Sequence, residues 1–160
     1  MPQLEPFLVD HLDGEIAQWI RNASLPSLGA GPQDAALQNW LTTMPAGARP
    51  LPPLAISALW LLAGELDASH TISQSIETPD GSLLHGIMHR REGDFSNAKY
   101  WFRRVGKHPV LAQLAATEYG DAMTFIDRCA AAVGSGSSEE QLCERLQWLE
   151  WQRVYLHCSR

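Results

Sequence analysis

Two pairs of polar residues have the spacing that places metal ligands or acid–base groups on adjoining helices. His85 and His89 are four residues apart, so a helix carries both imidazoles on one face, where two ring nitrogens can reach one metal ion. Asp67 and His70 are three residues apart and share a face with Gln74. If these helices pack together, three imidazoles and one carboxylate would surround a Zn²⁺ or Mn²⁺ ion, or form a buried acid–base network.

The same residues also have a purely structural interpretation. Polar groups buried between helices can satisfy one another as a hydrogen-bond network without binding any ligand. The chain contains neither H-E-x-x-H nor another recognised metal signature. Two hypotheses therefore stand side by side: a metal site formed by His70, His85, His89 and Asp67, and a structural network of the same groups.

Residues 81–108 form a basic segment in an acidic chain. This segment has six Lys and Arg residues against two acidic ones, a charge of +4, whereas the whole chain has a net charge of −6. Arginines beside aromatic rings can hold a carboxylate, a phosphate or a stacked base. The predicted ligand-binding residues are Arg90, Arg91, Lys99, Trp101, Arg103 and Arg104. The alternative is that these arginines pair with acidic residues of the N-terminal half of the chain.

Other function classes find no support in the sequence. It lacks the G-x-S-x-G, P-loop and G-x-G-x-x-G motifs. Cys129, Cys143 and Cys158 form no C-x-x-C pair, so we expect reduced thiols and a cytoplasmic location. The acidic N-terminus does not resemble a signal peptide, and the longest uncharged stretch, residues 50–64, is shorter than the ~20 residues of a spanning helix. No membrane partner is expected, and so acidic a chain is not a general nucleic-acid binder.

Helical periodicity runs along the whole chain, and no segment alternates as a β-strand does. We therefore expect an all-α fold, a single domain of antiparallel helix hairpins. Its regions would be N-terminal helices with a proline-rich connector (1–53), two hairpins (54–109) and C-terminal helices (110–160). The expected helices cover about residues 7–20, a short stretch after Asp34, and residues 54–63, 66–77, 83–91, 95–105, 110–119, 121–132 and 138–157.

An internal repeat supports the two central hairpins. Residues 57–81 align with residues 86–110 at an offset of 29. Gly64 falls opposite Gly93, and each is followed by an acidic residue, a combination that ends one helix and starts the next. The small residues at the predicted helix contacts are Ser57 and Ser69 in the first copy and Gly86 and Ala98 in the second. The repeat predicts a turn at Gly64 in place of one long helix.

The second copy resembles a tetratricopeptide-type hairpin. The residues that carry the resemblance are Gly86, Gly93-Asp94-Phe95, Ala98, Phe102 and Pro109. The resemblance covers at most residues 55–110, and the first copy departs from the pattern with Ser73 in place of the aromatic residue. It implies an irregular stack of helix hairpins. Residues 66–74 and 85–109 are also similar to a group of uncharacterised bacterial and fungal proteins, a similarity that implies no activity.

Two functions follow as hypotheses. The first is a non-enzymatic helical-repeat module that binds an acidic peptide or protein through the basic face of the hairpin at 83–105. The alternative is a metal-dependent or acid–base enzyme that uses the three histidines with Asp67. A homodimer that forms through the Trp- and Leu-rich face of the last helix remains open.

Overall fold

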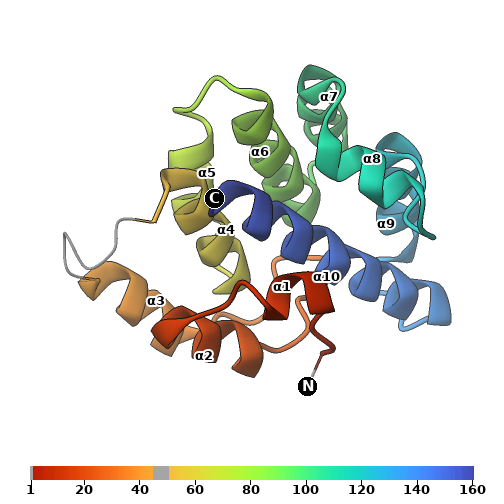
Figure 1. Cartoon of the computed structure of the whole chain (residues 1–160). Coiled ribbons are helices and arrows are strands. Elements are labelled where there is room, and N and C mark those ends of the chain that lie inside the picture. The colour runs from red at the N-terminus through yellow and green to blue at the C-terminus, as the bar shows by residue number, and fades with distance from the viewer. Residues whose placement is uncertain (1, 45–50) are drawn as a thin grey trace.

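The computed structural model describes residues 2–44 and 51–160, and these residues form helices and no strand (Figure 1). The helices are α1 (Pro6–Val9), α2 (Gly14–Asn22), α3 (Ala35–Thr43), α4 (Pro53–Leu62), α5 (Leu66–Ser73), α6 (Pro79–Glu92), α7 (Phe95–Val105), α8 (Pro109–Ala115), α9 (Ala122–Ala132) and α10 (Ser138–Cys158). The predicted all-α, single-domain fold is confirmed. Most of the predicted proline-rich connector, residues 44–53, lies outside the described residues. Among the described helices, none has the length and apolar character to cross a bilayer.

Two tight turns create the central hairpins α4–α5 and α6–α7. Gly64 and Gly93 have φ angles of +76° and +88°, a left-handed conformation that glycine adopts without a Cβ penalty. After Gly93, the N–H of Asp94 donates to the carbonyl of His89 over 3.0 Å and closes the end of α6. The predicted turn at Gly64 is confirmed.

The small residues of the repeat set the distance between paired helices. The hydroxyl of Ser57 in α4 lies 2.9 Å from the hydroxyl of Ser69 in α5, and both residues are buried. In the second hairpin, a Cβ added at Gly86 would lie 2.6 Å from Cδ2 of Phe102. Ala98 is fully buried on the same side of α7. Glycine, alanine and serine at these contact positions therefore let the helix backbones approach closely.

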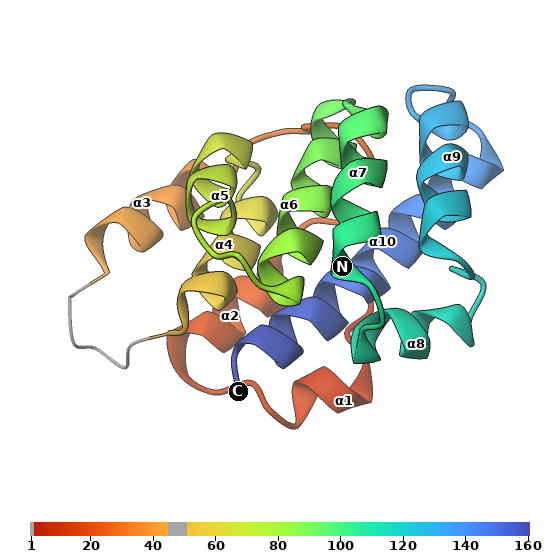
Figure 2. The ribbon, with the colours of Figure 1, turned by 90° about the horizontal axis from the view of Figure 1, so that it is seen from above.

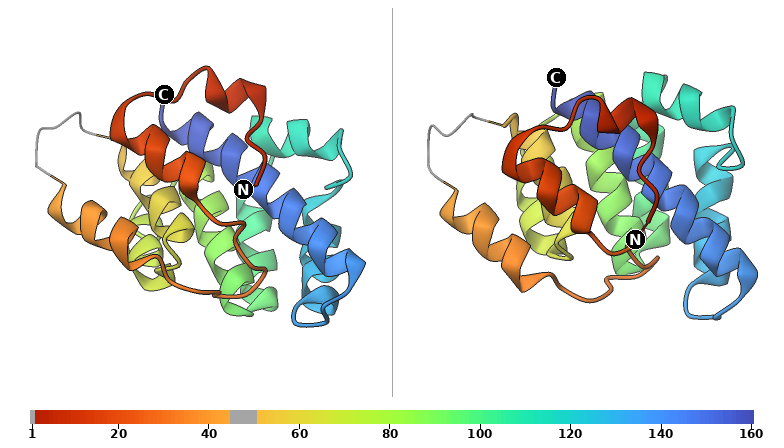
Figure 3. Two further views of the ribbon diagram at one scale, coloured as in Figure 1. Left: turned by 90° about the horizontal axis from the view of Figure 1, so that it is seen from below. Right: turned by 60° about the horizontal axis from the view of Figure 1, so that its bottom comes forward.

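Helix α6 lies at the centre of the molecule. Helices α5, α6, α7 and α9 stand in a row (Figure 2), and α10 crosses beneath them as a long diagonal (Figure 3). Every residue from Gly81 to Arg91 is buried. Helix α10 is also buried around most of its circumference, including Trp148. Both helices bury polar side chains as well as apolar ones.

A buried ion pair joins these two helices. One Nη of Arg90 donates to Oε2 of Glu150 over 3.0 Å, and the other contacts Oε1. Both side chains are fully buried. Each member of the pair forms one further hydrogen bond. Arg90 donates to Gln147 over 3.2 Å, and the hydroxyl of Tyr119 donates to Glu150 over 2.6 Å. Burial by itself lowers the pKa of Arg90, but the attraction and hydrogen bonds of Glu150 outweigh it and raise that pKa above its ordinary value.

Several predicted helix boundaries were wrong. Helix α5 ends at Ser73 and not at residue 77, and α8 ends at Ala115 and not at residue 119. The single helix expected over residues 7–20 is divided into α1 and α2, and Gly14 at the start of α2 has a φ of +64°. Residues 79–82, which lie between the predicted helices at 66–77 and 83–91, instead form the first turn of α6. There the hydroxyl of Thr78 accepts the N–H of Gly81 over 3.1 Å, and Pro79 occupies the first helical position, where its missing N–H costs nothing.

The close contact between α6 and α7 yields a stability test. Ala98→Leu should lower the free energy of unfolding by about 1–3 kcal/mol, because the fully buried methyl leaves no room for three more carbons. Thermal and urea unfolding measure the change. Ala112→Leu, at an exposed position of α8, is the matched control and should leave the melting temperature nearly unchanged. Equal melting temperatures for the two variants would contradict the packing described here.

Candidate metal centre

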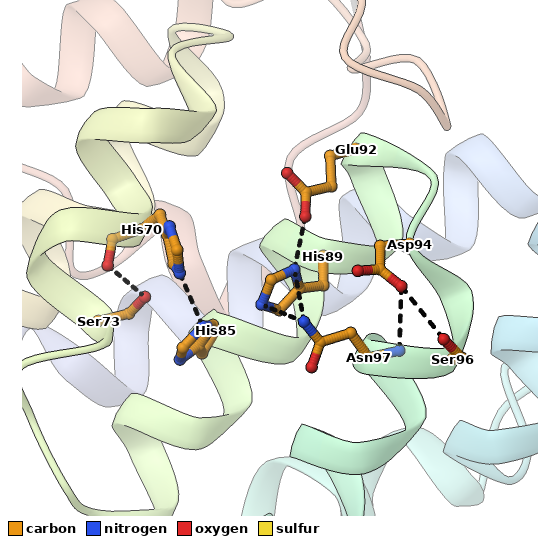
Figure 4. Close-up of polar contacts among 8 residues, drawn as sticks. All are labelled: His70, Ser73, His85, His89, Glu92, Asp94, Ser96 and Asn97. Carbon is orange, nitrogen blue, oxygen red and sulfur yellow. Dashed lines mark hydrogen bonds and ion pairs between the residues drawn. The ribbon is translucent and has the colours of Figure 1, made fainter.

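His70 of α5 and His85 and His89 of α6 form a compact cluster (Figure 4). The Nε2 atoms of His70 and His85 lie 2.9 Å apart. The ring centroids are separated by 4.6 Å for His70–His85, 4.7 Å for His85–His89 and 5.3 Å for His70–His89. One ring nitrogen from each histidine lies within 4.8 Å of the other two. The predicted convergence of the three histidines is confirmed.

Neighbouring helices hold the cluster from two sides. His85 and His89 lie one turn apart on α6, and α5 packs against this face. On the α7 side, the indole of Trp101 stacks on His85 with ring centroids 3.9 Å apart. His85 and His89 are 4% and 6% exposed, whereas His70 is half-buried. The cluster therefore reaches the surface at His70.

Glu92 at the end of α6 and Asn97 in the first turn of α7 orient His89. Oε1 of Glu92 lies 2.6 Å from its Nδ1, and the amide nitrogen of Asn97 lies 3.2 Å from its Nε2. A carboxylate accepts, so Nδ1 carries the proton, and the unprotonated Nε2 accepts an N–H of Asn97. A carboxylate behind a histidine in this way fixes the tautomer and increases the basicity of the ligating nitrogen in metal sites.

In His85, one of the two ring nitrogens lacks a hydrogen bond. Its Nδ1 is buried and has no hydrogen-bond partner among the described residues. Burial, followed by the nearby imidazoles of His89 and His70, lowers the pKa of His85 from 6.5 to about 4. The ring is consequently neutral at physiological pH, which is the state that ligates metals.

The spacing of the histidine nitrogens is compatible with a transition-metal ion. Nε2 is the atom of His85 that faces His70, so Nε2 is the nitrogen that would ligate, and Nδ1 would carry the proton. A tetrahedral Zn²⁺ with Zn–N bonds of about 2.0–2.1 Å requires ligand nitrogens roughly 3.3 Å apart. The His70–His85 contact of 2.9 Å would have to open by only about 0.4 Å, a small side-chain adjustment.

The carboxylate predicted for this site is not the one that contacts it. Asp67 is exposed in the first turn of α5, and its carboxylate is not part of the histidine cluster. Gln74, predicted at the edge, is exposed after the end of α5. Glu92 contacts the cluster instead. It follows His89 by three residues, the same spacing that singled out Asp67, so the sequence contained the signal.

The predicted basic face does not include Arg90 and Arg91, because both guanidinium groups are buried. Arg90 pairs with Glu150, and Arg91 donates to the carbonyls of Leu61, of Gly29 (3.3 Å) and of Ala30 (3.1 Å). Burial, and then repulsion from Arg90, lowers the pKa of Arg91 to about 10. These contacts fasten the loop between α2 and α3 to the end of α4.

The other predicted ligand-binding residues lie on α7. Lys99 forms an ion pair with Asp127 of α9. Arg103 and Arg104 are exposed. The guanidinium of Arg104 lies over the rings of Tyr100 and Trp101, at 5.8 and 5.4 Å from their centroids. Among the predicted ligand-binding residues, the exposed arginines therefore lie at the C-terminal end of α7.

A second group of titratable side chains could not be anticipated from spacing. Oδ1 of Asp80 lies 2.6 Å from Nε2 of His108 and 3.0 Å from Nε2 of His157. These residues belong to the start of α6, the N-cap of α8 and the end of α10. They are separated by 28 and 77 positions from Asp80, so only the tertiary fold brings them together.

Comparisons with known proteins do not extend this description. No family model, curated protein or solved structure matches the chain. The tetratricopeptide resemblance stays a prediction.

The neutral state of His85 predicts acid sensitivity of the metal-free protein. Its pKa is about 4 when folded and 6.5 when unfolded, so between these values the unfolded chain binds the extra proton. The contribution of neutral His85 to the free energy of unfolding is fully present above about pH 6.5. It is lost as the pH falls towards 4, and the loss is on the order of 3 kcal/mol, since each pKa unit corresponds to about 1.4 kcal/mol.

Urea unfolding of metal-free protein at a series of pH values measures this decrease. His85→Gln removes the titrating group, and its stability should depend less on pH between 6.5 and 4. Parallel profiles for the parent and the variant would contradict the assignment.

Proposed function

We propose that this protein binds a divalent transition-metal ion through His70, His85 and His89 and functions as a metal-dependent enzyme. The observation that carries the proposal is the convergence of three ring nitrogens within 4.8 Å from two neighbouring helices. Three protein ligands leave a fourth position for water or substrate, which is the arrangement of catalytic zinc sites. Such an ion lowers the pKa of bound water and polarises carbonyl or phosphoryl oxygens.

The residues around the three ligands support this proposal. Glu92 holds His89 in the tautomer whose Nε2 is unprotonated, so a metal ion could take the place of the Asn97 amide there, and Trp101 covers one face of His85. The half-buried His70 is the side from which a metal ion and a substrate would enter. Imidazole ligands suit zinc, copper, iron and nickel better than magnesium or calcium, so these metals are the expected class.

Metal binding to the purified full chain tests the proposal. Protein stripped with a chelator should bind one equivalent of Zn²⁺ and melt at a higher temperature, because a ligand that binds only the folded state stabilises it. His89→Ala should abolish both effects. His11→Ala, at an exposed histidine outside the cluster, is the matched control and should bind zinc as the parent does.

A milder variant separates a metal site from a structural cluster. Glu92→Gln keeps a hydrogen-bond acceptor beside His89 but removes the charge, and it should weaken zinc binding about 10–100-fold. Glu92 is exposed, so the fold should tolerate the change. If the stripped parent neither binds zinc nor gains stability from it, the cluster is structural and the proposal is wrong.

A second candidate function is the binding of an acidic peptide or protein by the end of α7. The observation in its favour is that Arg103 and Arg104 are both exposed and that the guanidinium of Arg104 lies over the aromatic rings of Tyr100 and Trp101. This surface is smaller than the one predicted, because Arg90 and Arg91 are buried.

Charge reversal tests the second candidate. The parent should bind a poly-glutamate peptide in a manner that weakens as salt rises, and the double variant R103E/R104E should lose this binding. R21E/R145E, at exposed arginines of α2 and α10, serves as the control with the same change in net charge. Equal losses in the two variants would show non-specific attraction and exclude a site on α7.

A further inference from the structure

A pocket of about 180 Å³ opens where α1, α8 and the C-terminal end of α10 meet, away from the histidine cluster. These helices lie side by side at one end of the molecule (Figures 1 and 2). The residues that line the pocket are Phe7, Pro109, Val110, Gln113, Arg153, Leu156, His157 and Arg160. At about 30 Å³ per water molecule, the volume corresponds to roughly six waters, so its occupant is small.

The polar groups of this pocket are suited to a negative charge. Arg153, His157 and Arg160 line it, and no Asp or Glu is among the described residues that do so. The Nη1 of Arg153 donates to Gln113 over 2.9 Å, and its guanidinium lies 4.5 Å from the centroid of the Phe7 ring. Its Nε is buried and has no partner within the described part of the chain. The guanidinium is thus held in place while its charge has no carboxylate partner at hydrogen-bond distance.

His157 is oriented by the carboxylate of Asp80. The backbone N–H of Val110 donates to Nδ1 of His108 over 3.2 Å, so the proton of His108 is on Nε2, from which it is donated to Oδ1 of Asp80. Nε2 of His157 donates to the same oxygen over 3.0 Å. Because both Nε2 atoms donate to Oδ1 of Asp80, the trio is a hydrogen-bonded clamp. Nδ1 of His157 remains for a ligand.

We propose that this pocket binds a small oxyanion, a carboxylate or phosphate group on a molecule of a few heavy atoms. Arg153 and Arg160 supply charge-assisted hydrogen bonds to the oxygens. His157 contributes a third donor when it is protonated, with Asp80 as its counterion. The apolar side chains of Phe7, Pro109 and Leu156 shield these contacts from water, which strengthens them. The proposal does not depend on the metal centre.

Calorimetric titration of chelator-stripped protein tests the proposal, with inorganic phosphate and succinate as probes at constant ionic strength. The parent should bind at least one of them with saturation, and the preferred probe identifies the anion class. R160Q, at an exposed position, and R153Q should each weaken binding about tenfold or more, the effect of one hydrogen bond to a charged group. R103Q, an exposed arginine of α7 outside the pocket, is the matched control and should bind as the parent does.

The outcome for R160Q keeps the test decisive even if R153Q fails to fold. No saturable heat with either probe, or equal affinities for the parent and R160Q, would overturn the proposal. So would an equal loss of affinity in R160Q and R103Q, because that result shows general attraction to a positive surface. None of these outcomes concerns zinc binding, so the two sites are tested separately.

Discussion

The ion pair between Arg90 and Glu150 is the interaction on which the arrangement of the helices depends. Both side chains are fully buried, and each charge is tolerated in the core only because the other neutralises it. Removing one partner of such a pair costs about 3–5 kcal/mol. Tyr119 and Gln147 supply further hydrogen bonds, and Nε of Arg90 has no partner among the described residues. The pair therefore fixes α10 beneath α6, and the other helices pack around this crossing.

Three consecutive residues of α6 have three different roles because a helix turns by about 100° per residue. His89 faces α5 and joins the histidine cluster, whereas Arg90 faces α10 and pairs with Glu150. Arg91 faces the loop between α2 and α3 and donates to its carbonyls. This division is possible because α6 is surrounded on all sides. The same burial lowers the pKa of His85 and keeps it neutral as a metal ligand requires.

Local spacing was sufficient to predict the hairpins and the histidine cluster. The turn at Gly64 followed from the repeat, and the four-residue spacing of His85 and His89 placed both rings on one helix face. The inward orientation of Arg90 and Arg91 could not be predicted from local spacing. Glu150 lies 60 residues from Arg90, and no local pattern shows that a charged side chain turns inwards to meet a partner so distant. The clamp at Asp80 was missed for the same physical reason, since its partners come from other helices.

The order of the helices along the chain has a consequence for how the protein is made. Helix α10 contains the counterion of Arg90, but it is the last helix of the described chain to be synthesised. Until Glu150 has emerged from the ribosome, burial of α6 would leave an uncompensated charge in the core, at a cost of several kcal/mol. We therefore expect that the hairpins synthesised earlier do not form a stable compact core before α10 is available. Acquisition of the native structure waits for α10, and the chain folds as one cooperative unit.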